Sequence, residues 1–200
     1  MPRMPDVLDT DEFSLPELCA ARLDGELIRV LGRWMPIDTP DLPAVRARVL
    51  GGRSTGPVIE GWSAAWVHGA TPVPPRVAQF CVPHGARVAR PRDPEVALRE
   101  VSIAETDIVR VGGLRCTSGE RTAYDLLRDP VLGPEVVEVI AALIDDGAVS
   151  AARLRERFAP ERRVPHRRLA LVRLSEAITR LASRTESSAR IHDPTETSRR

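Results

Sequence analysis

The stretch Gly112–Arg128, GGLRCTSGERTAYDLLR, contains the clearest local folding signals in the chain. Apolar Leu114 and Cys116 flank Arg115, the alternation expected of a half-buried strand. Thr117 and Glu120 have the spacing of a capping box, which predicts that a helix begins here. Arg121 and Asp125 are four residues apart and so fall on one face of that helix. The stretch therefore predicts a strand, a cap and a helix, with structural roles for Thr117, Glu120, Arg121 and Asp125.

Other segments extend this pattern into an α+β fold. Short alternating runs at 77–82, 98–103 and 108–111 predict a small, mainly antiparallel sheet. Residues 58–68 read as a helix, and the chain after Arg128 becomes helical, with a last helix from about Pro165 to Ser183. We therefore expect an α+β body at 51–183 and a disordered polar tail at 184–200.

The N-terminal part predicts a smaller unit. Residues 1–12 are acidic and contain two prolines, so we expect a flexible arm. A short helix follows from Phe13, and Leu27–Ile37 has the form of a hairpin with a turn at Gly32-Arg33. One helix and a hairpin are only the last part of a winged helix. Residues 13–50 thus predict an abbreviated winged-helix-like unit and a linker.

The composition limits the chemistry available to the chain. Its 29 basic residues are all arginine, so lysine-dependent sites are excluded, among them phosphate-loop, Schiff-base and restriction-type nuclease sites. Cys19, Cys81 and Cys116 are too widely spaced for a disulfide framework. The sequence has no stretch with the length of a membrane span or a signal peptide. We expect a reduced, cytoplasmic protein.

No stretch predicts an active site. Ser63 is close to the pattern of a nucleophile elbow, but it lies within a helical pattern rather than after a strand. Cys81 and His84 have the spacing of half a zinc site and lack an evident second pair of ligands. We expect neither catalytic residues nor a metal or cofactor, and read Ser63, Cys81 and Cys116 as packing residues.

The distribution of charge points to nucleic-acid binding instead. Residues 1–150 carry 16 arginines and 22 acids, whereas residues 151–200 carry 13 arginines and 6 acids. Eight of these arginines lie between Arg153 and Arg173, a density that would neutralise several phosphates. The alternative is a solvated helix face. If DNA is bound, the predicted contacts lie on the hairpin and in this cluster: Arg29, Arg33, Arg162, Arg163, Arg167 and Arg168.

Two segments carry a resemblance to a known family. Gly61–Ala70 (GWSAAWVHGA) and Gly112–Arg128 resemble the AbiEi-type antitoxins of type IV toxin–antitoxin systems, especially actinobacterial relatives. Gly25–Asp38 looks like the family's wing. Here Gly119 replaces the usual proline, only one helix precedes the wing, and the chain lacks the nuclease-like C-terminal domain of many relatives.

The resemblance implies a non-enzymatic protein with two partners. These would be operator DNA, bound as a repressor, and a nucleotidyltransferase toxin encoded in the same operon. One alternative is an orphan protein-interaction module that has lost DNA binding. It would form a homodimer, or bind a partner, through the row Leu171, Leu174, Ile178 and Leu181, which has coiled-coil-like spacing. A third alternative is an inactive remnant of a nuclease-fused relative.

Overall fold

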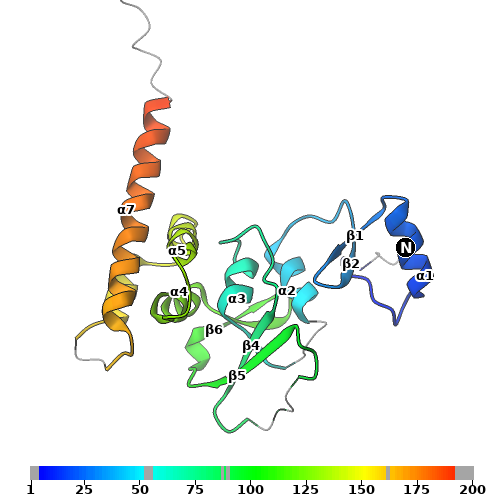
Figure 1. The fold of residues 1–200 in the computed structure, drawn as a ribbon, viewed down its shortest axis with the longest axis horizontal. Helices are drawn as coiled ribbons and strands as arrows, with labels where there is room; N and C mark the ends of the chain where they lie inside the picture. The colour runs from blue at the N-terminus through cyan, green and yellow to red at the C-terminus, as the bar shows by residue number, and fades with distance from the viewer. Residues whose placement is uncertain (1–4, 52–55, 87, 89–90, 161–162, 192–200) are drawn as a thin grey trace, which may run out of the picture. The chain divides into compact units, whose positions relative to one another are not determined.

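The computed structural model in Figure 1 describes residues 5–51, 56–86, 88, 91–160 and 163–191. The chain forms two compact units, Met1–Ser118 and Gly119–Arg200. Among the described residues there are seven α-helices and two sheets, and this confirms the predicted α+β class. The boundary between the units falls just before the helix of the Gly112–Arg128 stretch, a position that the sequence analysis did not mark.

The N-terminal unit begins with a helix and a hairpin. Helix α1 (Leu15–Leu23) starts at a capping box, in which the Ser14 amide donates to the Glu17 carboxylate over 2.9 Å. Strands β1 (Leu27–Val30) and β2 (Arg33–Pro36) pair in antiparallel register. The turn between them falls at Leu31-Gly32, one residue earlier than expected. Both residues have positive φ, 50° and 77°, as a two-residue hairpin turn of this hand requires.

Both faces of the hairpin are covered. On one face Leu27 and Trp34 form a small core with Leu18 of α1 and with Leu8. On the other face Met35 packs into the main core of the unit, together with residues of α2 (Pro43–Gly51). The hairpin is therefore part of the packed structure on both sides, and does not project as an isolated wing.

Residues 5–9 lie along the outer edge of β2, where the sequence analysis expected a flexible arm. The Leu8 amide donates to the Trp34 carbonyl over 2.8 Å, and the Leu8 side chain is only 1% exposed. Asp6 pairs with Arg48 of α2. The burial of Leu8 offsets the conformational entropy lost when this segment is ordered. The acidic composition of residues 1–12 does not indicate this burial.

The larger sheet has the strand order β5-β4-β3-β7-β6. Its strands are β3 (Val58–Ile59), β4 (Ala78–Pro83), β5 (Val96–Val101), β6 (Ile108–Val111) and β7 (Leu114–Thr117), with a 3-10 turn, η1 (Glu105–Asp107), before β6. Helix α3 (Gly61–Val67) follows β3 directly and is buried along most of its length. Ile59, Phe80 and Cys116, from three neighbouring strands, lie in the same core as Val49 and Leu50 of α2.

The strand directions differ from the mainly antiparallel sheet that the sequence predicts. Two of the pairs, β3–β4 and β6–β7, are antiparallel, whereas β4–β5 and β3–β7 are parallel. Residues 84–95 connect β4 to β5, and a return of about a dozen residues is the length that a parallel crossover needs. Alternating runs of four to six residues contain no information on direction, so the sheet is mixed.

The turn between β6 and β7 explains the two glycines that open the Gly112–Arg128 stretch. Gly112 and Gly113 both have positive φ, 58° and 86°. A Cβ atom on Gly112 would lie 2.5 Å from the carbonyl oxygen of Ala44 in α2. Glycine is needed here for the backbone conformation and for the close approach of α2.

The C-terminal unit is helical, as predicted. It contains α4 (Gly119–Arg128), α5 (Glu135–Asp145), α6 (Ala151–Arg157) and α7 (Arg167–Ile191). Helix α7 extends eight residues beyond the end that the sequence predicts. Ala170, Leu174 and Ala177 of α7 are buried, with α4 and α5 as its main neighbours. Leu174, from the row proposed for dimerisation, is 1% exposed and so belongs to the core of this unit.

Within the described ranges, no helix combines the length and the apolar character that crossing a membrane requires.

Candidate nucleic-acid interface

The two hairpin arginines predicted to contact DNA have different surroundings. Arg29 on β1 is exposed, and its guanidinium carbon lies 5.4 Å from the centre of the Trp34 ring. Arg33 on β2 is 20% exposed and forms an ion pair with Asp9 over 2.5 Å. The segment that covers the edge of β2 thus neutralises Arg33, which leaves Arg29 as the cation available to a ligand.

The pair with Arg33 also alters the ionisation of Asp9. Partial burial opposes the charged form, but a hydrogen bond from the Thr10 amide and the nearby charge of Arg33 outweigh it. Together they hold the pKa of Asp9 below its ordinary value of 3.8. Asp9 is therefore ionised at neutral pH, and the pair is charged on both sides.

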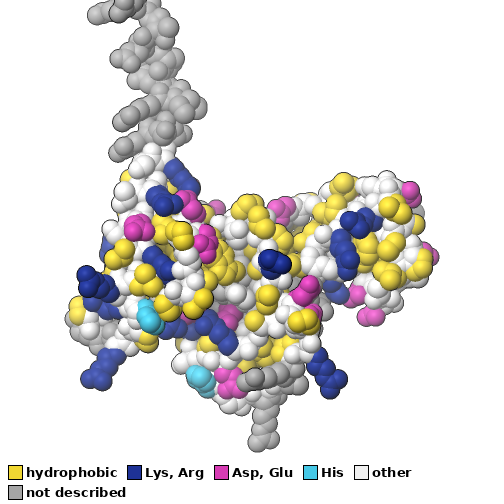
Figure 2. Space-filling view, viewed as in Figure 1, with side chains coloured by type: hydrophobic (Ala, Val, Ile, Leu, Met, Phe, Trp, Pro, Cys, Tyr) yellow, Lys and Arg dark blue, Asp and Glu magenta, His cyan; other side chains and the backbone are white. Residues whose placement is uncertain are grey.

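Exposed cations remain on the C-terminal unit. Arg163 precedes α7 and Arg168 lies in its first turn; both are exposed and form no ion pair with any described residue. Arg155 on α6 is likewise exposed. Figure 2 shows dark-blue side chains around the beginning of α7. Arg162, the other predicted contact, lies outside the described residues.

Two arginines of the same cluster serve the fold. Arg173 is 8% exposed and donates to the carbonyls of Leu127, Asp129 and Leu132, at and beyond the end of α4. Arg167 is half-buried and donates to the carbonyl of Phe158 over 2.5 Å. Carbonyls at helix ends lack partners within the helix and carry partial negative charge. The two guanidinium groups donate hydrogen bonds to these carbonyls. Because Arg167 is occupied in this way, it is no longer a candidate for a phosphate contact.

Arg157 of α6 has aromatic surroundings. Its guanidinium carbon lies 4.8 Å from the centre of the Tyr124 ring, and Arg128 approaches the same ring at 4.9 Å. Tyr124 also stacks on Phe158, with 5.0 Å between ring centres. These ring stacking and cation–π contacts hold α6 against α4. The eight-arginine cluster thus divides into members that hold this unit together and members that face solvent.

The predicted pair of α4 is present and buried. Arg121 Nε donates to Asp125 over 2.7 Å, and the two side chains are 7% and 5% exposed. Arg128 adds a second contact to Asp125, 3.0 Å long. A carboxylate shared between two guanidinium groups on one helix supports the fold, which is the role that the sequence analysis assigned to Arg121 and Asp125.

The residues at the start of α4 also contact other elements of the fold. The helix begins at Gly119, so Ser118 precedes the first helical residue. The Thr117 carbonyl lies 2.7 Å from Nε2 of His68, and the Glu120 carboxylate accepts from Arg153 over 3.2 Å. Each of these residues therefore connects the segment to an element outside it.

Of the candidates for nucleophilic or metal chemistry, Ser63 and Cys116 are buried, whereas His84 is not. Ser63 is buried in α3, and its hydroxyl accepts from the Gln79 amide over 2.8 Å. Cys116 is fully buried, and burial raises the pKa of its thiol to about 12. His84 is exposed, 4.0 Å from Glu100. The described residues contain no group of three or more side chains arranged to hold a metal ion.

Arg46, which no sequence pattern indicates, joins α2 to the end of α3 and to the segment before α2. From α2 it donates to the carbonyl of Trp66 at the end of α3 and to Asp41, both over 2.6 Å. The hydrogen bond from Arg46 lowers the pKa of Asp41, and this outweighs the opposing effect of burial. Nothing in the spacing of arginines distinguishes such a residue from a solvated one, since its partners are distant in sequence.

Comparison with known proteins gives a distant structural likeness. No protein-family model matches the chain, and no curated protein matches it. Among solved structures, the chain is similar to the RV2827C protein from Mycobacterium tuberculosis, at 19% identity and a TM-score of 0.47. The likeness covers 85% of this chain and 66% of that protein's chain.

Proposed function

We propose that the protein is a non-enzymatic, antitoxin-like regulatory protein of a type IV toxin–antitoxin system that contacts DNA through phosphates. Its partners would be its own operator and a nucleotidyltransferase toxin. The proposal begins from the two segments that resemble the AbiEi-type antitoxins. These segments meet in the fold: β3 immediately precedes the first and pairs with β7 of the second, and His68 contacts the Thr117 carbonyl.

The observation that carries the DNA contact is that Arg163 and Arg168, at the beginning of α7, are exposed and have no acidic partner among the described residues. The first turn of this 25-residue helix contains no acidic residue. A helix N-terminus favours anions, because its first amides lack helical partners and the helix dipole is positive there. Two cations placed at this end repel the dipole, and a phosphate would relieve that repulsion.

A mobility-shift assay tests this contact. The probe is the double-stranded DNA upstream of the coding sequence, titrated over a range of salt concentrations. We expect retardation at low salt, and expect the double variant Arg163→Glu/Arg168→Glu to reduce the slope of log K against log [salt] by about 1.8, for two lost phosphate contacts. The matched control is Arg180→Glu, which alters an arginine already paired with Glu138.

Two results would contradict the DNA contact. One is the absence of retardation at low salt, and the other is a salt dependence that is the same for the double variant and the control. The antitoxin role has a separate test, in which the chain is co-expressed with a nucleotidyltransferase encoded beside it. Restored growth is the expected result, and growth arrest despite full expression of the chain would contradict that role.

A second candidate function is that of a protein-interaction module without DNA binding. It is favoured by an open, mostly apolar cavity in the N-terminal unit, which the DNA-binding proposal does not use.

A further inference from the structure

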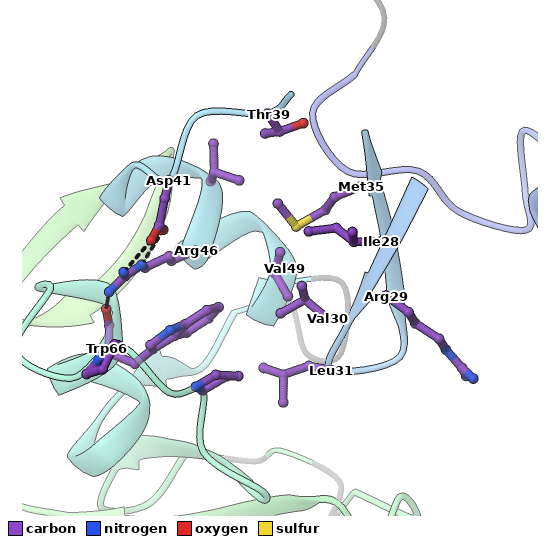
Figure 3. Close-up of a pocket in the computed structure, with 13 residues that line it drawn as sticks. Ile28, Arg29, Val30, Leu31, Met35, Thr39, Asp41, Arg46, Val49 and Trp66 are labelled. Carbon is purple, nitrogen blue, oxygen red and sulfur yellow. Dashed lines mark hydrogen bonds and ion pairs between the residues drawn. The ribbon is translucent and has the colours of Figure 1, made fainter. Parts of the chain in front are cut away.

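The N-terminal unit contains a cavity of about 350 Å³ between the hairpin and the helices α2 and α3. Figure 3 shows Met35, Val49 and Trp66 around it, and Pro72 and Pro74 also contribute to its wall. Its polar lining includes Arg46 and Asp41, which are paired with each other. The cavity therefore offers an apolar interior with little uncompensated charge.

The backbone of β1 forms one side of this cavity. Four consecutive residues, 28–31, line it, although side chains in a strand alternate between the two faces. The side chain of Arg29 points away from the cavity in Figure 3, so Arg29 contributes its main chain to the lining. The cavity thus follows the outer edge of a strand.

The register of the hairpin determines which main-chain groups face this edge. Val30 and Arg33 flank the two-residue turn and form a hydrogen-bonded pair, and such pairs alternate along an antiparallel ladder. Arg29 and Trp34 are therefore a non-hydrogen-bonded pair, whose amide and carbonyl groups point outward. The Trp34 carbonyl shows this directly, because it accepts from Leu8 on the outer edge of β2.

The covered edge of β2 indicates what the edge of β1 would bind. On β2 an extended segment supplies a main-chain donor, an apolar side chain (Leu8) and an acid (Asp9) that pairs with Arg33. On β1, Arg29 has no acidic partner among the described residues, and Ile28 is 38% exposed. The two edges offer similar chemistry, but only that of β2 is covered within the described residues.

We propose that the edge of β1 and the adjoining cavity bind an extended segment of another polypeptide, which adds a strand beside β1. The residue of that segment opposite Arg29 is acidic, and its flanking residues are apolar and point into the cavity. Main-chain hydrogen bonds to Arg29 supply affinity. The cavity selects apolar side chains of the bound segment, and the Arg29 guanidinium group selects its acidic side chain. This docking surface is independent of the DNA contact at α7.

Peptide binding to the full chain tests the proposal. The probe is a capped, fluorescently labelled peptide of about six residues, the usual length of a strand, in which valine alternates with aspartate. We expect binding by fluorescence anisotropy and slower hydrogen exchange of the amides at 27–30. A peptide in which valine alternates with lysine is the matched control, and we expect no binding of it.

Variants at Arg29 separate the two contributions. Arg29→Gln retains the amide but removes the charge, and we expect about fivefold weaker binding of the aspartate peptide, the upper range for a cross-strand ion pair. Arg29→Glu should reverse the preference in favour of the lysine peptide. Arg29→Pro removes the outward donor on an edge strand that tolerates proline, and we expect binding of the aspartate peptide to be lost.

Several results would overturn the proposal. These are an absence of binding at about 1 mM aspartate peptide, a range in which weak complexes are still detected, or equal binding of the lysine peptide. Protection on β2 rather than on β1 would also contradict it, since it would show displacement of residues 5–9. If Arg29→Pro does not fold, the reversed preference of Arg29→Glu decides the matter alone.

Discussion

The N-terminal hairpin and the beginning of α7 both carry the arginines expected to contact DNA, but their charges are compensated differently. On the hairpin, Asp9 neutralises Arg33, and each face contributes residues to a core. At the beginning of α7, Arg163 and Arg168 are exposed and have no acidic partner in the described part of the chain. An arginine-rich stretch therefore predicts a phosphate-binding surface only once the acids and carbonyls that its arginines contact within the protein are known.

The largest expected effect concerns the buried arginine of the α7 region. Replacing Arg173 by Met leaves several carbonyls near the end of α4 without donors, and we expect a loss of about 4 kcal/mol in the free energy of unfolding. Urea denaturation measures it. The matched control is Arg168→Met, on the exposed side of the same helix, with an expected change within about 0.5 kcal/mol. Equal losses in the two variants would remove the distinction between structural and exposed arginines.

The next effect concerns the buried pair of α4. Asp125→Ala leaves Arg121 charged and buried, so we expect it to destabilise the protein by about 3 kcal/mol. Changing both residues, as Arg121→Met/Asp125→Leu, should recover most of this loss, because no unpaired charge then remains in the core. Thermal and urea unfolding of the three variants give the comparison. A double variant as unstable as Asp125→Ala would show that the pair itself is required.

A smaller, pH-dependent effect is expected on the hairpin. The pKa of Asp9 is lower in the folded protein than its ordinary value of 3.8, so its contribution to stability is present above that pH. It is lost as the pH falls through the lower, folded-state pKa. The side chain is 35% exposed, and we expect the contribution to be no more than about 1 kcal/mol after screening by solvent.

Urea denaturation of the chain and of Asp9→Asn at several pH values measures this contribution. The difference in stability between the two proteins should be constant near neutral pH and disappear in acid. A difference that persists below the folded-state pKa would mean that the ion pair with Arg33 is not its source.

The smallest effect on stability is expected at the beginning of α7, where it should be opposite in sign to the effect on DNA binding. Arg168→Glu places an acid in the first turn of a helix, which the helix dipole favours by about 0.5 kcal/mol. The same change should weaken retardation of DNA. Thermal unfolding and mobility shift on one preparation measure both. A variant that loses both stability and DNA binding would indicate that Arg168 supports the fold.

Part of the fold follows from local sequence alone. The strand, turn and helix of Gly112–Arg128 are predictable because their signals lie within a few residues of one another, and so is the short helix that follows Phe13. Strand direction was not predicted, since whether β5 runs parallel to β4 depends on the path of the connecting residues. The order of residues 5–9 was missed for a similar reason: it depends on the burial of Leu8 against Trp34.

The candidate site was predicted only in outline. The density of arginine predicts phosphate contacts near α7, but four neighbouring members differ in their surroundings: Arg163 and Arg168 are exposed, whereas Arg167 and Arg173 donate to backbone carbonyls. Arg46 went unnoticed entirely. All these residues have the same side chain and similar polar neighbours in the sequence.

The α+β class, the hairpin, the position of the α4 ion pair and the region of high positive charge can all be predicted from local sequence. These depend on periodicity, turn residues and i,i+4 spacing, which act over a few residues. Which arginines are neutralised, which hairpin edge is covered and where the units divide can be seen only in the folded structure. Those outcomes depend on partners such as Asp9 for Arg33 and the end of α4 for Arg173, which folding brings close from distant positions in the chain.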